Sequence, residues 1–236
     1  MSVAVLVSGS GTNMTAIVEE QRRIEKKGGE HYGRIDCVFT NVPGCEGAVK
    51  AVQWGIPVVS ISSKRFFGLL GKSPDDEQAR DYYDAAAFSL IEGVCTPDLI
   101  VLAGYRRRLG EQIHRQYSNR IVNLYPGDTT KDYLVRGVDA SVQALRKGED
   151  SIRATVFFGR YEIRFGPALV QSKPVSLAGF TEDDAADMAE KIRREAEWVI
   201  YPFAVHGLIA KGRVAVDEED FVRVDGVSMG KGGYRF

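Results

Sequence analysis

Residues 8–13 (SGSGTN) combine a flexible backbone with hydroxyl and amide side chains, and they connect an apolar run to an amphipathic stretch. A helix that opens directly from such a turn leaves backbone N–H groups unpaired at the positive end of its dipole, and these groups bind phosphate or another anion. Gly9 and Gly11 let the backbone approach a ligand closely, while Thr12 and Asn13 can add side-chain donors. The segment therefore predicts an anion site, although a plain tight turn between a strand and a helix would use the same residues.

A dinucleotide-binding loop would need a third glycine in the spacing G-x-G-x-x-G, and this position is Met14. Such a fold also carries an acidic residue at the end of its second strand, where this chain has Asn41. A phosphate group that is not part of a dinucleotide therefore fits the loop better.

The 236-residue chain has 44% hydrophobic and 27% charged residues, which is the composition of a globular protein with one sizeable core. Its formal net charge of -1 gives no reason to expect nucleic acid or an anionic membrane as a partner. The N-terminus does not read as a signal peptide, and the longest apolar runs are far shorter than a membrane-spanning helix. The three cysteines form no CxxC motif, so we expect reduced thiols, a cytoplasmic protein and no bound metal.

Short apolar runs alternate with amphipathic stretches over the first part of the chain, which is typical of a parallel sheet built from β–α–β units. After residue 148 the pattern changes to two strands around a turn, a long helix that Thr181 caps and Pro202 ends, and a terminal hairpin. We therefore expect one α/β domain with a mostly parallel central sheet, flanking helices and an antiparallel C-terminal extension. The expected strands are residues 3–7, 35–39, 57–61, 98–102, 120–123, 151–158, 167–175 and a hairpin at 213–227, and the expected helices are residues 14–26, 45–54, 75–91 and 181–201.

Six segments, VAVLVSGSGTN, VFTN, PDLIVLAGYRRRL, RIVNLYP, FGPALVQ and EWVIYP, occur in this order across nearly the whole chain. The series resembles the phosphoribosylglycinamide formyltransferase family, the folate-dependent transformylases of purine biosynthesis. The resemblance implies a Rossmann-like formyltransferase fold over residues 1–236, with a phosphoribosyl-binding half up to about residue 110 and a folate-binding and catalytic half from about residue 111. It also implies transfer of a formyl group from 10-formyltetrahydrofolate to the amine of glycinamide ribonucleotide, by a monomer or homodimer.

The family's phosphoribosyl-binding residues have counterparts in this chain. Gly11, Thr12 and Asn13 match the loop that holds the substrate phosphate, and Glu197 matches the glutamate that holds the ribose hydroxyls. A carboxylate suits this task because it accepts hydrogen bonds from two adjacent hydroxyls. Without the family, the favoured interpretation of Glu197 is a solvated acid on the face of a helix that carries several acids.

The pterin of the folate lies, in the family, on the backbone of the segment that matches Arg107, Arg108 and Leu109. LAGYRRRL resembles this segment, although Arg106 and Arg108 are unusually basic for it. The two arginines fit either a solvated start of a helix or an attraction for the glutamate carboxylates of the folate.

The catalytic positions of the family are altered. Its N-x-H-P motif reads Asn123-Leu124-Tyr125-Pro126, so that tyrosine replaces the histidine that helps to stabilise the oxyanion. The aspartate expected before a G-P turn is Arg164, and a histidine usual on a nearby strand is Phe157. The histidines of this chain stand elsewhere in the sequence, at His31, His114 and His206.

These replacements matter because a tyrosine, with a pKa of about 10, is a poor proton shuttle at neutral pH, and an arginine cannot act as a base. Three interpretations remain open. Formyl transfer could continue with Asn123 and Tyr125 as oxyanion donors, Arg164 as a fixed charge, and a water, Asp128 or Asp132 as proton relay. Another acyl or one-carbon reaction on a phosphoribosyl substrate could use Arg164 to bind an extra anionic group, or the chain could bind phosphoribosyl compounds without turnover.

The segment that follows the altered motif, residues 127–137, is longer than the family's loop and has glycine at both ends. This composition permits a lid over the site without establishing one.

Overall fold

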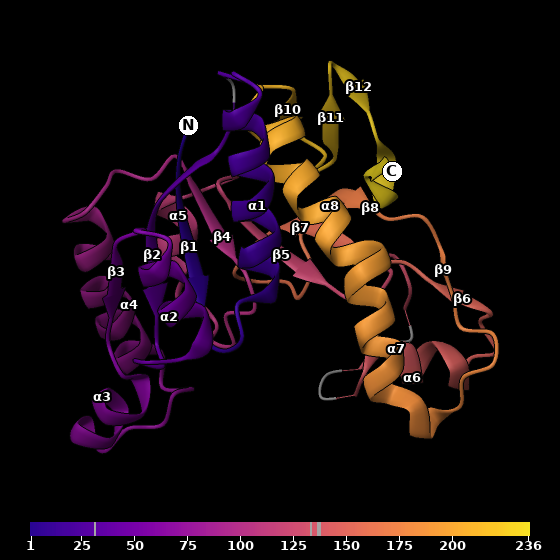
Figure 1. Ribbon diagram of the computed structural model, residues 1–236. Coiled ribbons are helices and arrows are strands. Elements are labelled where there is room, and N and C mark those ends of the chain that lie inside the picture. The colour runs from indigo at the N-terminus through magenta and orange to yellow at the C-terminus, as the bar shows by residue number, and fades with distance from the viewer. Residues whose placement is uncertain (31, 133, 136–137) are drawn as a thin grey trace. The chain divides into compact units, whose positions relative to one another are not determined.

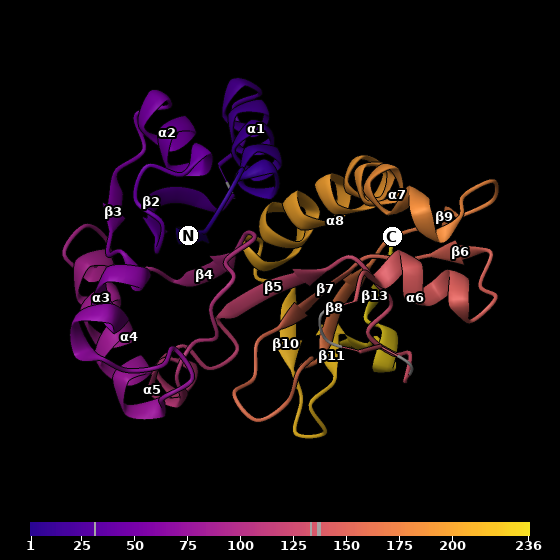
Figure 2. The same cartoon turned by 90° about the horizontal axis from the view of Figure 1, so that it is seen from below.

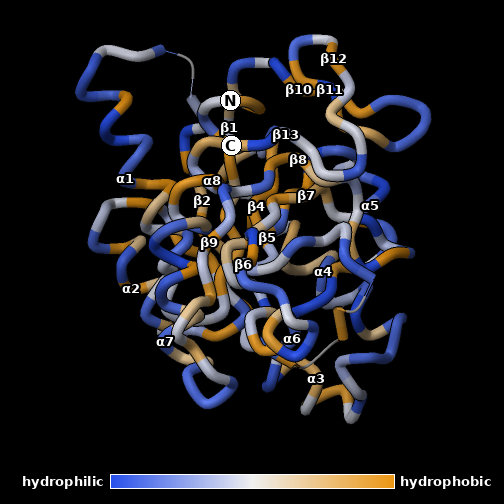
Figure 3. Tube along the Cα trace, turned by 90° about the vertical axis from the view of Figure 1, so that its right-hand side faces the viewer, coloured by the Kyte–Doolittle hydropathy of each residue, from blue (hydrophilic) through white to orange (hydrophobic). Residues whose placement is uncertain are grey.

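A parallel sheet forms the N-terminal part of the fold, in the order β5-β4-β1-β2-β3. The apolar residues of its central strand are at most 1% exposed, because helices cover both faces of the sheet. Figure 3 shows the hydrophobic residues of these strands in orange. The strands are β1 (Ser2–Val7), β2 (Arg34–Thr40), β3 (Val58–Ser60), β4 (Leu99–Leu102) and β5 (Ile121–Tyr125).

The computed structural model describes residues 1–30, 32–132, 134–135 and 138–236 (Figure 1). The chain divides into two units: Met1–Asn123 with Gly159–Arg164, and Leu124–Phe158 with Phe165–Phe236. Strand β5 passes from the first unit into the second after Asn123.

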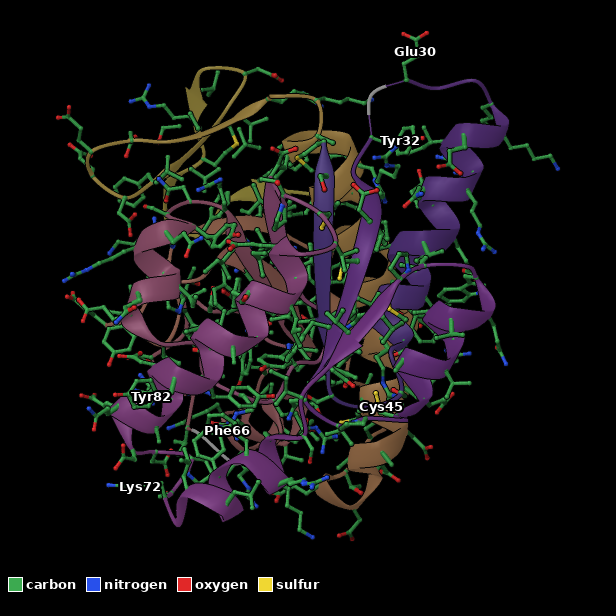
Figure 4. All side chains as sticks on the ribbon, turned by 90° about the vertical axis from the view of Figure 1, so that its left-hand side faces the viewer. Glu30, Tyr32, Cys45, Phe66, Lys72 and Tyr82 are labelled. Atoms are coloured by element: carbon green, nitrogen blue, oxygen red, sulfur yellow. The ribbon has the colours of Figure 1, made fainter. Side chains whose placement is uncertain are left out.

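Helices α1 and α2 cover one face of the first sheet, and α3, α4 and α5 cover the other (Figure 2). Ala4 and Leu6 of β1 face the second group, in a core cluster that includes Tyr83 and Phe88 of α4. Phe66 of α3, labelled in Figure 4, packs against Tyr83 with ring centroids 5.2 Å apart. The helices are α1 (Thr12–Lys26), α2 (Glu46–Gln53), α3 (Ser63–Leu70), α4 (Glu77–Glu92) and α5 (Glu111–Gln116).

The second unit contains antiparallel strands and a long helical run. Strands β7 and β8 pair antiparallel, β13 pairs parallel with β8, and β10, β11 and β12 form an antiparallel sheet. The helical run from α7 to η3 lies along one face of β7 and β8 (Figure 2). The elements are α6 (Ala140–Arg146), β6 (Ser151–Ile152), β7 (Thr155–Phe158), β8 (Ala168–Gln171), β9 (Val175–Ser176), η1 (Glu182–Asp184), α7 (Ala185–Ile192), η2 (Arg193–Glu197), α8 (Trp198–Pro202), η3 (Phe203–Ile209), β10 (Val214–Val216), β11 (Val222–Val224), β12 (Val227–Ser228), η4 (Gly230–Gly232) and β13 (Tyr234–Arg235).

The expected α/β class, with a mostly parallel sheet, flanking helices and antiparallel C-terminal strands, is confirmed. Thr181 caps the long helical run through a capping box with Asp184, as expected. The prediction that Pro202 ends this run is wrong, because the chain stays helical to Ile209. Pro202 cannot donate a backbone hydrogen bond, and the wide π-helical turns η2 and η3 lie on either side of the short α-helical segment that contains it.

Other elements differ from the expectation for identifiable reasons. Helix α3, capped by Ser62, and helix α6, capped by Asp139, are not among the expected helices, and both are short, with eight and seven residues. Each expected strand at 151–158 and 167–175 is divided in two: at the first break Ala154 N–H donates to the Ser172 hydroxyl at 3.0 Å, and the second break contains Pro174, which lacks a donor.

No helix among the described residues is long and apolar enough to cross a membrane. Within the same residues, no three His, Cys, Asp or Glu side chains are grouped so that they could hold a metal ion.

Candidate functional site

The loop between β1 and α1 is held against the start of α2 by a close backbone approach. Gly11 is left-handed, with φ 68°, and a Cβ at this position would lie 2.7 Å from the Cα of Gly47. The Gly47 N–H donates to the carbonyl of Gly9 at 2.9 Å. Two glycines therefore let the loop fold onto α2, and this contact fixes the shape of the predicted anion site.

The same loop presents unused backbone donors. Among the described residues, no acceptor meets the N–H groups of residues 9–12, and no side chain caps α1. The Thr12 hydroxyl is likewise without a partner in this part of the chain, and Lys50 donates from Nζ to the carbonyl of Ser10 at 3.1 Å. Unpaired N–H groups at a helix start, with a lysine at the loop, can together bind a phosphate group.

The segment after β4 is fixed at both ends by buried side chains. The Arg106 N–H donates to the Ser8 hydroxyl at 2.9 Å, and the Gly110 N–H donates to the Asp84 carboxylate at 2.6 Å. Between these anchors, the backbone N–H and C=O groups of residues 107–109 make no hydrogen bond to any described residue. A planar heterocycle with donors and acceptors on its edge could pair with this stretch of backbone.

The three arginines of this segment differ in burial and in their partners. The Arg107 guanidinium packs over the rings of Phe67 at 4.4 Å and Tyr83 at 5.4 Å, so its side chain belongs to the core of the first unit. Arg108 is exposed and donates to the Tyr161 carbonyl at 3.5 Å, while Arg106 is exposed without a side-chain partner among the described residues. Leu109 is buried.

Asn123 lies at the same end of the first sheet as the loop after β1 and the segment after β4. Leu102 of β4 is the register partner of both Leu6 of β1 and Asn123 of β5, so the carboxyl ends of three parallel strands form one row. Strand order reverses between β1 and β4, and ligands of open α/β sheets bind outside the carboxyl ends at such a point. The Asn123 side chain is half-buried there.

Arg164 closes the short segment Gly159–Arg164, which belongs to the first unit. Gly159 donates its N–H to the carbonyl of Ile121 at 2.8 Å, and the Tyr161 hydroxyl donates to Glu77 of α4 at 3.1 Å. The segment therefore lies against β5, α4 and Arg108, and Arg164 is half-buried at its end.

Tyr125 belongs to the second unit, in an aromatic cluster with two phenylalanines. Its ring lies 4.8 Å from that of Phe165, which meets Phe157 edge-to-face at 5.4 Å. A Cβ at Gly127 would lie 2.6 Å from the Tyr125 ring, so the ring folds back over its own loop. Tyr125 and Phe157 stand where the family resemblance implies histidines, and in this chain both pack against Phe165.

Asp128 is a poor candidate for the proton relay. Its Oδ1 accepts from the Thr130 hydroxyl and from Gln171 Nε2, both at 2.6 Å. Burial acts to raise the pKa of this carboxyl, but the hydrogen bonds from Thr130 and Gln171 outweigh it and hold the pKa below its usual value. Asp132 is exposed. Tyr133, Arg136 and Gly137 of the segment 127–137, and with them the idea of a lid, lie outside the described residues, as does His31.

Glu197 is 7% exposed and lies in the π-helical turn η2 of the second unit. Its burial rules out the interpretation as a solvated acid on a helix face. Wide turns of this kind occur frequently at functional sites. Of the other histidines, burial lowers the pKa of His114 to about 4, and His206 is buried in η3.

Ser8, Asn41 and Asp84 hold the loops of the candidate site in place, a role that the sequence patterns did not assign to them. Ser8 and Asn41 directly follow buried strands, and a polar residue at the carboxyl end of a parallel strand is a usable signal. Asp84 lies on the buried face of α4, where an acid is rare unless it has a partner.

Replacing Asp84 with asparagine is expected to remove a pH dependence from folding stability. Burial raises the pKa of this carboxyl to about 6, against 3.8 when it is not perturbed, and the Gly110 N–H and nearby arginines oppose this only in part. The native state thus holds the proton more tightly, so the contribution of Asp84 to wild-type stability falls by roughly 2–3 kcal/mol as the pH rises from about 4 to about 6. Urea unfolding of both proteins across this range measures the difference. A stability difference that does not vary with pH would contradict the raised pKa.

A sequence profile of the formyl transferase family matches residues 1–205. The phosphoribosylglycinamide formyltransferase of Escherichia coli is 28% identical over 234 residues, which cover 99% of this chain and 98% of that protein. That of Haemophilus influenzae is 29% identical over 233 residues, covering 98% and 97%. The solved structure of the Coxiella burnetii phosphoribosylglycinamide formyltransferase, in complex with CHES, matches with a TM-score of 0.80 at 26% identity, covering 100% of this chain and 99% of that one. Because the profile spans most of its length, the chain belongs to the formyl transferase family.

Proposed function

We propose that this protein transfers a formyl group from 10-formyltetrahydrofolate to the amine of glycinamide ribonucleotide, in purine biosynthesis. One observation carries the proposal: the uncapped loop after β1 and the unpaired backbone after β4 lie next to each other at the strand-order reversal. The first suits a phosphate monoester and the second suits the edge of a pterin. The relatives from Escherichia coli, Haemophilus influenzae and Coxiella burnetii bear the name of this activity.

For the substrate, we assign the phosphate to Gly11, Thr12 and Asn13, and the ribose hydroxyls to Glu197. The unpaired N–H groups at the start of α1 support the first assignment, and the burial of the Glu197 carboxylate supports the second. For the folate, we assign the backbone of Arg107, Arg108 and Leu109.

We infer that residues 1–236 act as one functional domain. Its two ligands do not divide at about residue 110, because Glu197 would hold the ribose and the backbone of residues 107–109 would hold the folate. The inward packing of Arg107 leaves Arg106 and Arg108 as the side chains available to the glutamate carboxylates of a folate.

In the reaction, the amine nitrogen attacks the formyl carbon, and the carbonyl oxygen becomes an oxyanion. The new carbon–nitrogen bond remains, the bond from that carbon to the folate nitrogen breaks, and tetrahydrofolate leaves. The amine loses a proton and the folate nitrogen gains one. We assign the amide of Asn123 and the phenol of Tyr125 as oxyanion donors and Arg164 as a fixed positive charge. Because the pKa of Asp128 is lowered, water is the better relay for the proton.

Incubation with glycinamide ribonucleotide and 10-formyltetrahydrofolate, with release of tetrahydrofolate followed by absorbance, tests the proposal. We expect turnover below that of a family member with histidine and aspartate at these positions, because acid–base help is worth about 10²–10⁴ in rate. Absence of turnover at high protein concentration would sink it, and binding of the ribonucleotide alone would then identify a protein that binds without catalysis.

The double variant Tyr125→His, Arg164→Asp extends this test. Restoring an imidazole and a carboxylate is expected to raise kcat by about tenfold or more, since both can carry protons near neutral pH. The single variants serve as controls, because acid–base residues that act as a unit give little when restored one at a time. An unchanged kcat in the double variant would mean that these positions do not carry the chemistry.

A further inference from the structure

A row of buried polar side chains crosses the carboxyl edge of the first sheet. Ser8 follows β1, Asn41 follows β2 and Ser63 begins α3, and each is less than one-tenth exposed. The Ser8 hydroxyl donates to Asn41 Oδ1 at 2.6 Å, and Asn41 Nδ2 donates to the Ser63 hydroxyl at 3.1 Å. The row is internally paired and therefore costly to disturb.

The Ser8 hydroxyl also holds the neighbouring segment. Its one proton is used towards Asn41, so its lone pairs remain to accept the Arg106 N–H at 2.9 Å. Ser8 is at the same time the first residue of the loop with unpaired N–H groups at residues 9–12. The Ser8 hydroxyl oxygen thus links the loop of residues 8–13, the proposed phosphate site, to the segment of residues 107–109 with its unpaired backbone groups.

We propose that Ser8 is a positioning residue that sets the separation between the phosphoribosyl substrate and the folate. This inference rests on the proposed function. The amine and the formyl carbon must be held about 3–3.5 Å apart to react, and a misplacement of about 1 Å can cost 10²-fold in rate. Without the hydroxyl, the Arg106 N–H loses its acceptor, and of the two backbone hydrogen bonds that fix the ends of residues 106–110 the one at Gly110 remains.

The Ser8→Ala variant tests this role. We expect kcat to fall roughly 10–100-fold, while the Kd for ribose 5-phosphate changes less than about threefold, because the N–H groups of residues 9–12 remain. Ser8→Thr, which restores a hydroxyl, is expected to recover most of kcat. Ser8→Cys keeps about the size of the side chain but has a weaker acceptor, so its kcat is expected to lie between those of Ser8→Ala and Ser8→Thr. This variant keeps the test decisive if Ser8→Ala does not fold.

Ser63→Ala is the matched control. It removes a buried hydrogen bond from the same row but leaves the contact between Ser8 and Arg106 intact. A similar fall in Tm is expected for Ser8→Ala and Ser63→Ala, with kcat of the control within about threefold of wild type. The proposal is overturned if Ser8→Ala keeps wild-type kcat per folded molecule, or if both variants lose kcat equally.

Failure of the proposed function is distinguishable from failure of this inference. If the wild type shows no turnover, the affinity for tetrahydrofolate is measured with and without saturating ribose 5-phosphate. The inference then predicts that the sugar phosphate tightens tetrahydrofolate binding about fivefold or more in wild type and in Ser63→Ala, and that this coupling disappears in Ser8→Ala. Absence of coupling in wild type, or its persistence in Ser8→Ala, overturns it.

Discussion

Replacing Asn123 with alanine is expected to lower kcat for formyl transfer by about 10²–10³-fold while KM for either substrate changes little. The side chain lies at the carboxyl end of β5, level with Leu102 and Leu6 and therefore beside the loops after β4 and β1. An amide donor aimed at the developing oxyanion stabilises the transition state more than the bound substrates, so its loss appears in kcat. The loss should be large because Asn123 is the one member of the N-x-H-P motif's polar pair that this chain retains.

Asn123→Asp is the matched test of charge. It keeps the shape of the side chain, removes the NH₂ donor and places a negative charge where the oxyanion forms, so its kcat should be lower than that of the alanine variant. Initial rates over a range of both substrates separate kcat from KM. If both variants keep kcat within about threefold of wild type, Asn123 is not the oxyanion donor.

Gly11→Ala is expected to weaken binding of glycinamide ribonucleotide by roughly 10–100-fold, the equivalent of about one lost hydrogen bond to a charged group. The φ of 68° is strained for any residue with a side chain, and the new Cβ would lie 2.7 Å from backbone of Gly47, which cannot rotate away. Relief requires the loop to move off α2, which turns the N–H groups of residues 9–12 out of their common direction. Stability should fall by about 2–3 kcal/mol as well.

Gly68→Ala in α3, outside this loop, provides the control. No atom lies within 4 Å of a Cβ at this position, and its φ is not in the left-handed region. Calorimetric titration of ribose 5-phosphate should therefore give a Kd close to wild type for Gly68→Ala and a much weaker one for Gly11→Ala. Equal affinities for the two variants would show that the loop does not hold the phosphate.

The sheet strands could be predicted because each is a short apolar run that ends at a polar or glycine residue, as VAVLV does before Ser8. Glu197 could be placed only through the family resemblance, since its burial depends on a wide helical turn that periodicity does not reveal. The anchoring of Arg106 by Ser8 joins residues 98 positions apart, and the inward turn of Arg107 depends on Phe67 and Tyr83. Such contacts between distant segments leave no local pattern in one sequence.

The wide turns around Pro202 have a consequence for how the chain tolerates changes of length. A π-helical turn closes its hydrogen bond over one more residue than an α-helical turn, so η2 and η3 each hold a surplus position. Loss of one residue within η2 could convert it to an ordinary turn and leave the flanking helix in register, whereas the same loss in α4 would rotate its buried stripe towards water. Relatives should therefore differ in length more readily in the turns on either side of Pro202 than in α4. A deletion in η2 would, however, displace Glu197, which lies in that turn.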